Sequence, residues 1–114
     1  MIIHGIYKLQ EILNRSGVEW TLGPLTLAYT LDIVYEPILD IAIYFEDIER
    51  LDIELLRNWG IVNIFKCRNT GFSNRAIYVL GVPCISPRDI VESYELNRNY
   101  PLIDRILRRL FSKT

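Results

Sequence analysis

Histidine and cysteine, the usual protein ligands for zinc, are scarce in this chain of 114 residues. The sequence has one histidine, His4, and two cysteines, Cys67 and Cys84, which do not form a CxxC pair. No zinc spacing and no Ser-His-Asp arrangement can be built from them, and a disulfide between the cysteines is permitted but not implied. No signal-peptide pattern or apolar run of membrane-span length is present, so we expect a soluble, cytoplasmic protein.

An excess of one charge is also lacking, because 13 Lys and Arg oppose 14 Asp and Glu, for a formal net charge of −1. The charges are nevertheless unevenly placed. Residues 97–114 hold a single acid and five basic side chains, namely Arg98, Arg105, Arg108, Arg109 and Lys113. Such a segment contacts nucleic acid or an acidic partner in some proteins. The simpler interpretation is a solvated helix face whose cations complement the helix C-terminus.

Half of the residues are hydrophobic, and no repeat, linker or low-complexity tract is visible. A chain of this size buries enough surface to fold without disulfides or a metal, so we expect one domain over residues 1–114. Apolar spacing predicts helices over residues 2–16, 24–31, 46–60, 86–96 and 101–111, and strands over 18–22, 38–45, 61–67, 75–80 and 81–85. Strands interleaved with helices indicate an α/β or α+β fold, with helices flanking a mixed central sheet of about four to five strands.

Individual residues predict several boundaries and pairings. Ser86 is the expected N-cap of its helix, and Pro101 is the expected start of the last helix. A break near Asp52 is expected in the third helix, and the third and fourth strands are expected to pair as a hairpin. The last helix is expected to bury one apolar stripe, made of Leu102, Ile103, Ile106, Leu107 and Leu110.

Two tyrosines near the basic segment have two interpretations. Tyr94 and Tyr100 lie beside Arg98 in the sequence. They fit a platform on which nucleic-acid bases stack with support from the cation. They also fit an amphipathic rim of the core, which is the interpretation we favour.

Asp40 is the one acid inside the apolar stretch "PILDIAIYF" at positions 37–45. A buried carboxylate without partners would cost several kcal/mol or shift its pKa, so partners are expected. One interpretation gives Asp40 a cation or a nucleotide hydroxyl to bind. The other, which we favour, places it near the surface at a strand end, paired with an arginine or with backbone N–H groups.

Four stretches resemble, in order, the segments of a known family. They are "LQEILNRSGVEWTLGPLTLAY", "PILDIAIYFED", "LRNWGIVNIF" and "LGVPCISPRDIVESYELNRNYPLIDRIL". Together they cover most of the chain and resemble the minimal nucleotidyltransferases, a group that includes antitoxin-type and AbiEii-like proteins. The resemblance implies a nucleotidyltransferase-like fold over the whole chain.

The residues at the family's active-site positions depart from its pattern. The family binds a triphosphate with a Gly-Ser turn at a helix N-terminus and holds magnesium with carboxylates at i and i+2 of one strand. The equivalent turn here is Gly23-Pro24, and proline has no N–H to donate. Asp40 stands on the equivalent strand, with Ile38 and Ala42 two positions to either side. The resemblance therefore implies a degenerate active site without a metal.

Three functions fit these observations. The one we favour is a catalytically degenerate domain that acts as a binding or regulatory protein without a cofactor. By resemblance, its partner would be a small helical HEPN-type protein of a toxin–antitoxin pair, or a second copy as a homodimer. The second function is an active, Mg²⁺-dependent nucleotidyltransferase using Asp40 with another acid such as Asp32 or Glu36. The third is a nucleic-acid-binding regulator that uses Arg98, Arg105, Arg108 and Arg109.

Overall fold

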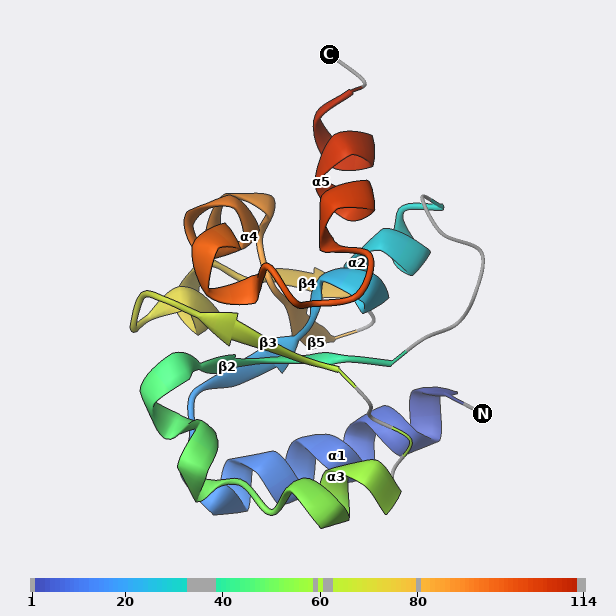
Figure 1. Cartoon of the computed structure of the whole chain (residues 1–114). Helices are drawn as coiled ribbons and strands as arrows, with labels where there is room; N and C mark the ends of the chain where they lie inside the picture. Colours follow the sequence, from blue (N-terminus) through green and yellow to red (C-terminus); the bar gives the residue numbers. More distant parts are fainter. Residues whose placement is uncertain (1, 33–38, 59, 61–62, 80, 113–114) are drawn as a thin grey trace.

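A mixed sheet with helices on both faces organises the molecule in the computed structural model (Figure 1). The structure describes residues 2–32, 39–58, 60, 63–79 and 81–112. Over these residues the sheet has five strands. Helices α1 and α3 lie on one face, and α2, α4 and α5 lie on the other. The predicted α+β class and mixed sheet are confirmed.

The element order agrees with the order predicted from the apolar pattern. The helices are α1 (Ile2–Ser16), α2 (Pro24–Thr30), α3 (Ile53–Asn58), α4 (Pro87–Glu92) and α5 (Ile103–Phe111). The strands are β1 (Trp20–Leu22), β2 (Ile41–Tyr44), β3 (Ile64–Cys67), β4 (Ile77–Val79) and β5 (Val82–Cys84). Short 3₁₀ helices follow or precede them: η1 (Phe45–Arg50), η2 (Phe72–Arg75) and η3 (Tyr94–Asn97). The expected break near Asp52 separates η1 from α3.

The strand order is β3-β2-β1-β5-β4. Strand β2 pairs antiparallel with β1 and parallel with β3, and β5 pairs parallel with β1 and antiparallel with β4. The predicted hairpin between the third and fourth strands is therefore wrong, because β3 and β4 lie at opposite edges. Strand β4 instead turns back onto β5, and Gly81 in that turn has φ +81°, a conformation that glycine adopts without strain.

The core lies on both faces of the central strands. Every residue of β1 is buried, and so are Ile41, Ala42 and Ile43 of β2. Strands covered on both faces are expected to be apolar throughout rather than alternating. Leu9 and Leu13 of α1 close the core from one side, and the buried side chains of the other layer include Leu25, Ile90, Ile103 and Ile106.

The outer edge of β3 is covered by side chains rather than by another strand. The Asn97 side chain accepts from the Lys66 N–H at 2.8 Å and donates to the Lys66 carbonyl at 2.7 Å. The Ser93 hydroxyl accepts from the Arg68 N–H at 2.9 Å. These bonds satisfy backbone groups that an uncovered edge would offer to another chain.

The start of α5 differs from the prediction. Pro101 does not begin the helix, because Leu102 adopts a left-handed conformation (φ +68°) and α5 starts only at Ile103. Leu102 is 42% exposed, so its predicted place in the buried stripe is also wrong. Ile103 and Ile106 are buried as predicted, and Leu107 and Leu110 pack partly against the core. The turn at Leu102 leaves Tyr100 pointing inward, where it is buried.

Candidate functional site

Asp40 lies directly before β2, with its carboxylate at the N-terminal end of α2. Its side chain has no exposed surface, so the expectation that it lies near the surface is wrong. Pro24 is the first residue of α2, a position where the missing N–H of proline is not needed. The structure thus brings together Gly23 and Pro24 of the predicted phosphate-type turn and Asp40 of the predicted strand.

Among the described residues, four donors bond to the Asp40 carboxylate. The Leu25 N–H donates to Oδ2 at 2.9 Å, and the Thr26 N–H and hydroxyl donate to Oδ1 at 2.9 and 2.8 Å. The Tyr100 hydroxyl donates to Oδ2. An ionised carboxylate offers about four lone-pair sites, so these donors use its hydrogen-bonding capacity. The predicted backbone partners are confirmed, whereas the alternative of an arginine partner is not what the structure shows.

Gly23 lets the carboxylate approach the turn. A Cβ placed on Gly23 would lie 2.8 Å from Asp40 Oδ1 and closer still to Oδ2. The Gly23 N–H also donates to the Asp40 carbonyl at 2.9 Å, and the Asp40 N–H donates to the Thr26 hydroxyl at 3.0 Å. The glycine that resembles a phosphate-turn residue therefore provides the space that an internal carboxylate occupies.

The donors that the described residues supply to Asp40 are all uncharged. Burial raises the pKa of Asp40, because transfer from water penalises the charged form, and the hydrogen bonds from Tyr100, Leu25 and Thr26 oppose this rise. Burial and the neighbouring carboxylate together raise the pKa of Tyr100 strongly, so its phenol stays protonated and remains a donor. The arrangement stabilises an internal fold contact and leaves the carboxylate engaged with the protein rather than open to a substrate.

Other acids do not converge on Asp40 within the part of the chain that the structure describes. No three His, Cys, Asp or Glu side chains form a metal-type cluster among the described residues. Asp32 is exposed, just beyond the end of α2, with φ +58°. Glu36 and Ile38 lie outside the described residues. The position two residues after Asp40 is Ala42, which is buried in β2.

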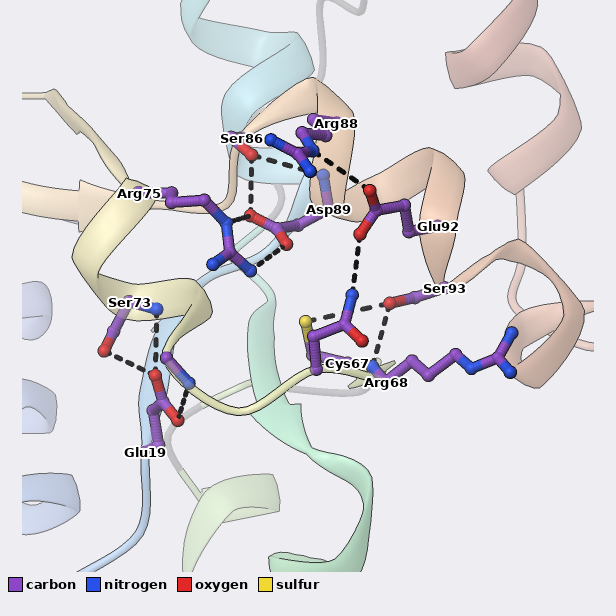
Figure 2. Close-up of polar contacts among 12 residues, drawn as sticks. Glu19, Cys67, Arg68, Ser73, Arg75, Ser86, Arg88, Asp89, Glu92 and Ser93 are labelled. Carbon is purple, nitrogen blue, oxygen red and sulfur yellow. Dashed lines mark hydrogen bonds and ion pairs between the residues drawn. The ribbon is translucent and has the colours of Figure 1, made fainter.

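A second polar network joins the loop after β3 to α4 and β1 (Figure 2). Asp89 is fully buried and accepts from the Arg75 guanidinium at 2.7 and 3.2 Å and from the Ser86 hydroxyl at 2.7 Å. Ser86 caps α4 as predicted, because its hydroxyl accepts from the Asp89 N–H at 3.2 Å. The Glu19 carboxylate, beside β1, accepts from the N–H groups of Gly71 and Ser73 at 2.8 and 3.0 Å. This network fixes the loop over residues 68–75.

The two cysteines are free, buried thiols, so the permitted disulfide is not formed. Burial raises the pKa of Cys67 to about 11 and that of Cys84 to about 12. A thiol is nucleophilic only as the thiolate. Both side chains therefore act as core residues, and Cys67 additionally accepts a weak hydrogen bond from Ser93 at 3.7 Å.

The basic residues of the C-terminal segment separate into two groups. Arg98 forms an exposed ion pair with Glu95 at 3.0 Å. Arg105, Arg108 and Arg109 line a hollow of about 540 Å³ beside α5, together with Ser112 and the start of the helix. Lys113 lies outside the described residues. Three of the four arginines predicted as a nucleic-acid or partner contact thus lie together on α5, and Arg98 does not line the hollow.

Sequence reasoning missed Thr26 as a partner of Asp40, and it left Tyr100 between a core rim and a base-stacking platform. Tyr100 is buried and bonded to Asp40, and its ring packs edge-on against Phe65 at 5.6 Å between centroids, so it belongs to the core. The sequence signal for Thr26 was its place in the first turn after Gly-Pro, where N–H groups lack helical partners. No local signal connects Tyr100 with a residue 60 positions earlier.

Comparison with known proteins gives no relative: no protein-family model, no curated protein and no solved structure matches the chain. The described residues contain no helix with the length and apolar character needed to cross a membrane.

Proposed function

We propose that this chain is a nucleotidyltransferase-like domain that has lost catalysis and acts as a binding or regulatory protein. The observation that carries the proposal is the hydrogen bonding of the buried Asp40 carboxylate. Its two oxygens already accept from Leu25, Thr26 and Tyr100. Coordination of Mg²⁺ requires free carboxylate oxygens at about 2.0–2.1 Å, and Asp40 would have to break these bonds to supply one.

The environment of the turn supports the same proposal. In the family that the sequence resembles, the helix N-terminus receives the anionic triphosphate. Here the N–H groups of Leu25 and Thr26 already donate to an anion, which belongs to the protein itself. The Gly23 backbone lies too close to Asp40 for a phosphate to enter between them. An internal carboxylate therefore substitutes for the ligand at this position.

Calorimetric titration with Mg²⁺-nucleotides tests the proposal directly. We expect no metal-dependent heat and no rise in melting temperature, because a ligand that binds only the folded state would stabilise it. The four common ribonucleoside triphosphates are titrated separately, with and without the metal. Saturable uptake that requires Mg²⁺ would contradict the proposal and favour the active nucleotidyltransferase that uses Asp40 with Asp32 or Glu36.

The partner in this proposal is a second copy of the chain or, by resemblance, a small helical HEPN-type protein of a toxin–antitoxin pair. The exposed edge strand β4 supports self-association, because Tyr78 is 68% exposed and Ile77 42% exposed. Tyr78 pairs with Pro83, which has no N–H, so the backbone bonds of Tyr78 are directed away from β5. Two copies of Tyr78 are thus able to exchange backbone hydrogen bonds about a two-fold axis.

Sedimentation of the wild-type chain and of two variants tests the β4 contact. Tyr78→Lys adds a charge to the edge and is expected to shift a dimer to the monomer, since charged edge strands resist pairing. Val91→Lys, at an exposed position of α4, is the matched control and is expected to leave the dimer intact. A monomeric wild-type chain would exclude the homodimer and leave the helical partner, which is tested by co-purification with a helical protein encoded beside this chain.

A further inference from the structure

The hollow beside α5 is lined by basic residues that have no role in the proposed function. Arg105, Arg108 and Arg109 line it with Ser112, and the turn before the helix contributes Tyr100 and Leu102. The spacing of i, i+3, i+4 and i+7 places the four polar residues on one face of the helix. At a rise of about 1.5 Å per residue, this face extends roughly 10 Å along α5.

The three arginines of this face are available for an external anion. No ion pair involves them within the ranges that the structure describes, whereas Arg98 is held by Glu95 and Arg75 by Asp89. The acid in the lining, Asp104, accepts from the Tyr94 hydroxyl at 2.6 Å. All three arginines are exposed, so their charged groups lie in solvent rather than in a buried contact.

An acid-rich segment lies on the opposite side of the sheet from the α5 face. The segment 46–54, which covers η1 and the start of α3, holds the acids Glu46, Asp47, Glu49, Asp52 and Glu54 and one arginine. In Figure 1, α5 projects from one side of the sheet and α3 lies on the other. In a protein with a formal net charge of only −1, this separation favours the approach of a polyanion toward α5.

We propose that the α5 face, formed by Arg105, Arg108, Arg109 and Ser112, binds the phosphates of single-stranded nucleic acid. The length of the face favours a chain of phosphates over a single anion. Arginine contacts phosphate with two N–H groups at once and also stacks on planar bases. The exposed side chain of Leu102 at the rim supplies apolar surface beside the charges, which suits unpaired bases. This inference goes beyond the proposed function and does not depend on it.

The test is fluorescence anisotropy of a labelled single-stranded oligonucleotide over a series of salt concentrations. Contacts with three phosphates predict a slope of about −2 in the plot of log affinity against log salt, since each contact on a single strand contributes about −0.7. The triple variant Arg105→Ala, Arg108→Ala, Arg109→Ala is expected to lose this slope. The control is Arg15→Ala, Arg50→Ala, Arg57→Ala, which removes the same charge from α1, η1 and α3 and is expected to keep it.

Each alternative outcome overturns the inference in a distinct way. Absence of wild-type binding, or a control variant that loses binding equally, would show that the α5 face is not a specific site. Equal affinity for polyglutamate or for duplex would exclude the single-strand choice. Binding of inorganic phosphate alone, with no oligonucleotide uptake, would identify a site for a free anion. Circular dichroism of both triple variants confirms that each is folded, and Mg²⁺-nucleotide calorimetry reports separately on the Asp40 site.

Discussion

Two fully buried carboxylates, Asp40 and Asp89, each lie at the N-terminal turn of a helix and are stabilised in different ways. Asp89 belongs to the first turn of α4 itself and is bonded to the Arg75 guanidinium and the Ser86 hydroxyl. Asp40 comes from a different segment, and its donors among the described residues are neutral. The difference shows that a buried carboxylate is tolerated here either by a countercharge or by complete hydrogen bonding, because an unsatisfied one would be very costly.

The two sites also differ in what they connect. The Asp89 network holds one loop, over residues 68–75, against α4 (Figure 2). Asp40 connects three segments that are distant in the sequence, because Thr26, Asp40 and Tyr100 come from α2, the start of β2 and the turn before α5. Removal of Asp40 is therefore expected to affect more of the fold than removal of Asp89.

The largest expected effect is that of Asp40→Ala. It leaves the N–H groups of Leu25 and Thr26 and the hydroxyl of Tyr100 without their acceptor in a buried site. We expect the free energy of unfolding to fall by about 3–5 kcal/mol, since each unsatisfied buried donor costs about 1–3 kcal/mol. Urea unfolding measures the loss. Asp40→Asn keeps the volume and one acceptor oxygen but turns an NH2 group towards the donors of the other oxygen, so its loss is expected to be smaller than that of the alanine variant but not zero. An alanine variant as stable as wild type would contradict the role of Asp40 as a buried acceptor.

Gly23→Ala is expected to have the next largest effect. The new methyl group would lie 2.8 Å from Asp40 Oδ1 and closer still to Oδ2, so the carboxylate and its donors must shift. We expect a loss of about 1–3 kcal/mol, the usual range for overpacking a buried site. Combining Gly23→Ala with Asp40→Ala makes space for the methyl group, and the double variant should lose less than the sum of the two single losses. Strict additivity in urea unfolding would show that the two residues do not contact each other.

Arg75→Ala is expected to have a smaller effect and to sharpen the comparison. Asp89 would keep the Ser86 hydroxyl and would gain solvent access where the half-exposed guanidinium was. We expect a loss of about 1–2 kcal/mol, between the values for surface and buried ion pairs. Arg88→Ala, which removes an exposed pair with Glu92, is the matched control and should cost less than about 0.5 kcal/mol. Equal losses would mean that the burial of Asp89 is unimportant.

The elements of this fold were predictable because their signals are local. Ser86 indicated the start of α4 as its expected N-cap, and the apolar spacing indicated α1 and α2. These residues act on their immediate neighbours, so the sequence order of the chain is sufficient to interpret them. The presence of Asp40 in an apolar stretch similarly predicted that partners must exist.

The pairings were not predictable because they depend on distant residues. The hairpin between the third and fourth strands was expected from their short separation, but the parallel pairing of β2 with β3 moved β3 to the opposite edge from β4. The helix expected from Pro101 began later because Leu102 adopts a left-handed conformation that only the three-dimensional context favours. The hydrogen bond between Tyr100 and Asp40 likewise depends on the three-dimensional arrangement and not on neighbouring residues. Such long-range choices have no signature in residue type or spacing.

The pH dependence of stability is expected to give the smallest effect and to distinguish the Asp40 site by its sign. Because burial raises the pKa of Asp40, the folded state binds its proton more tightly than the unfolded state does. The stabilisation from protonation is therefore complete below the ordinary carboxyl pKa of about 3.9 and is lost as pH rises through the folded-state pKa. Other carboxylates contribute their own dependence, so the informative quantity is the difference between wild type and Asp40→Asn in urea unfolding.

We expect this difference, wild type minus Asp40→Asn, to become less favourable to wild type as pH rises from about 4 towards neutrality. The side-chain amide of the Asp40→Asn variant does not titrate, so every other group cancels when its environment is unchanged. Tyr100→Phe removes one bond that favours the charged form and should move the same transition to higher pH. A difference that grows with pH would instead mean that the four hydrogen bonds outweigh burial and that Asp40 is more acidic in the fold than in the unfolded chain.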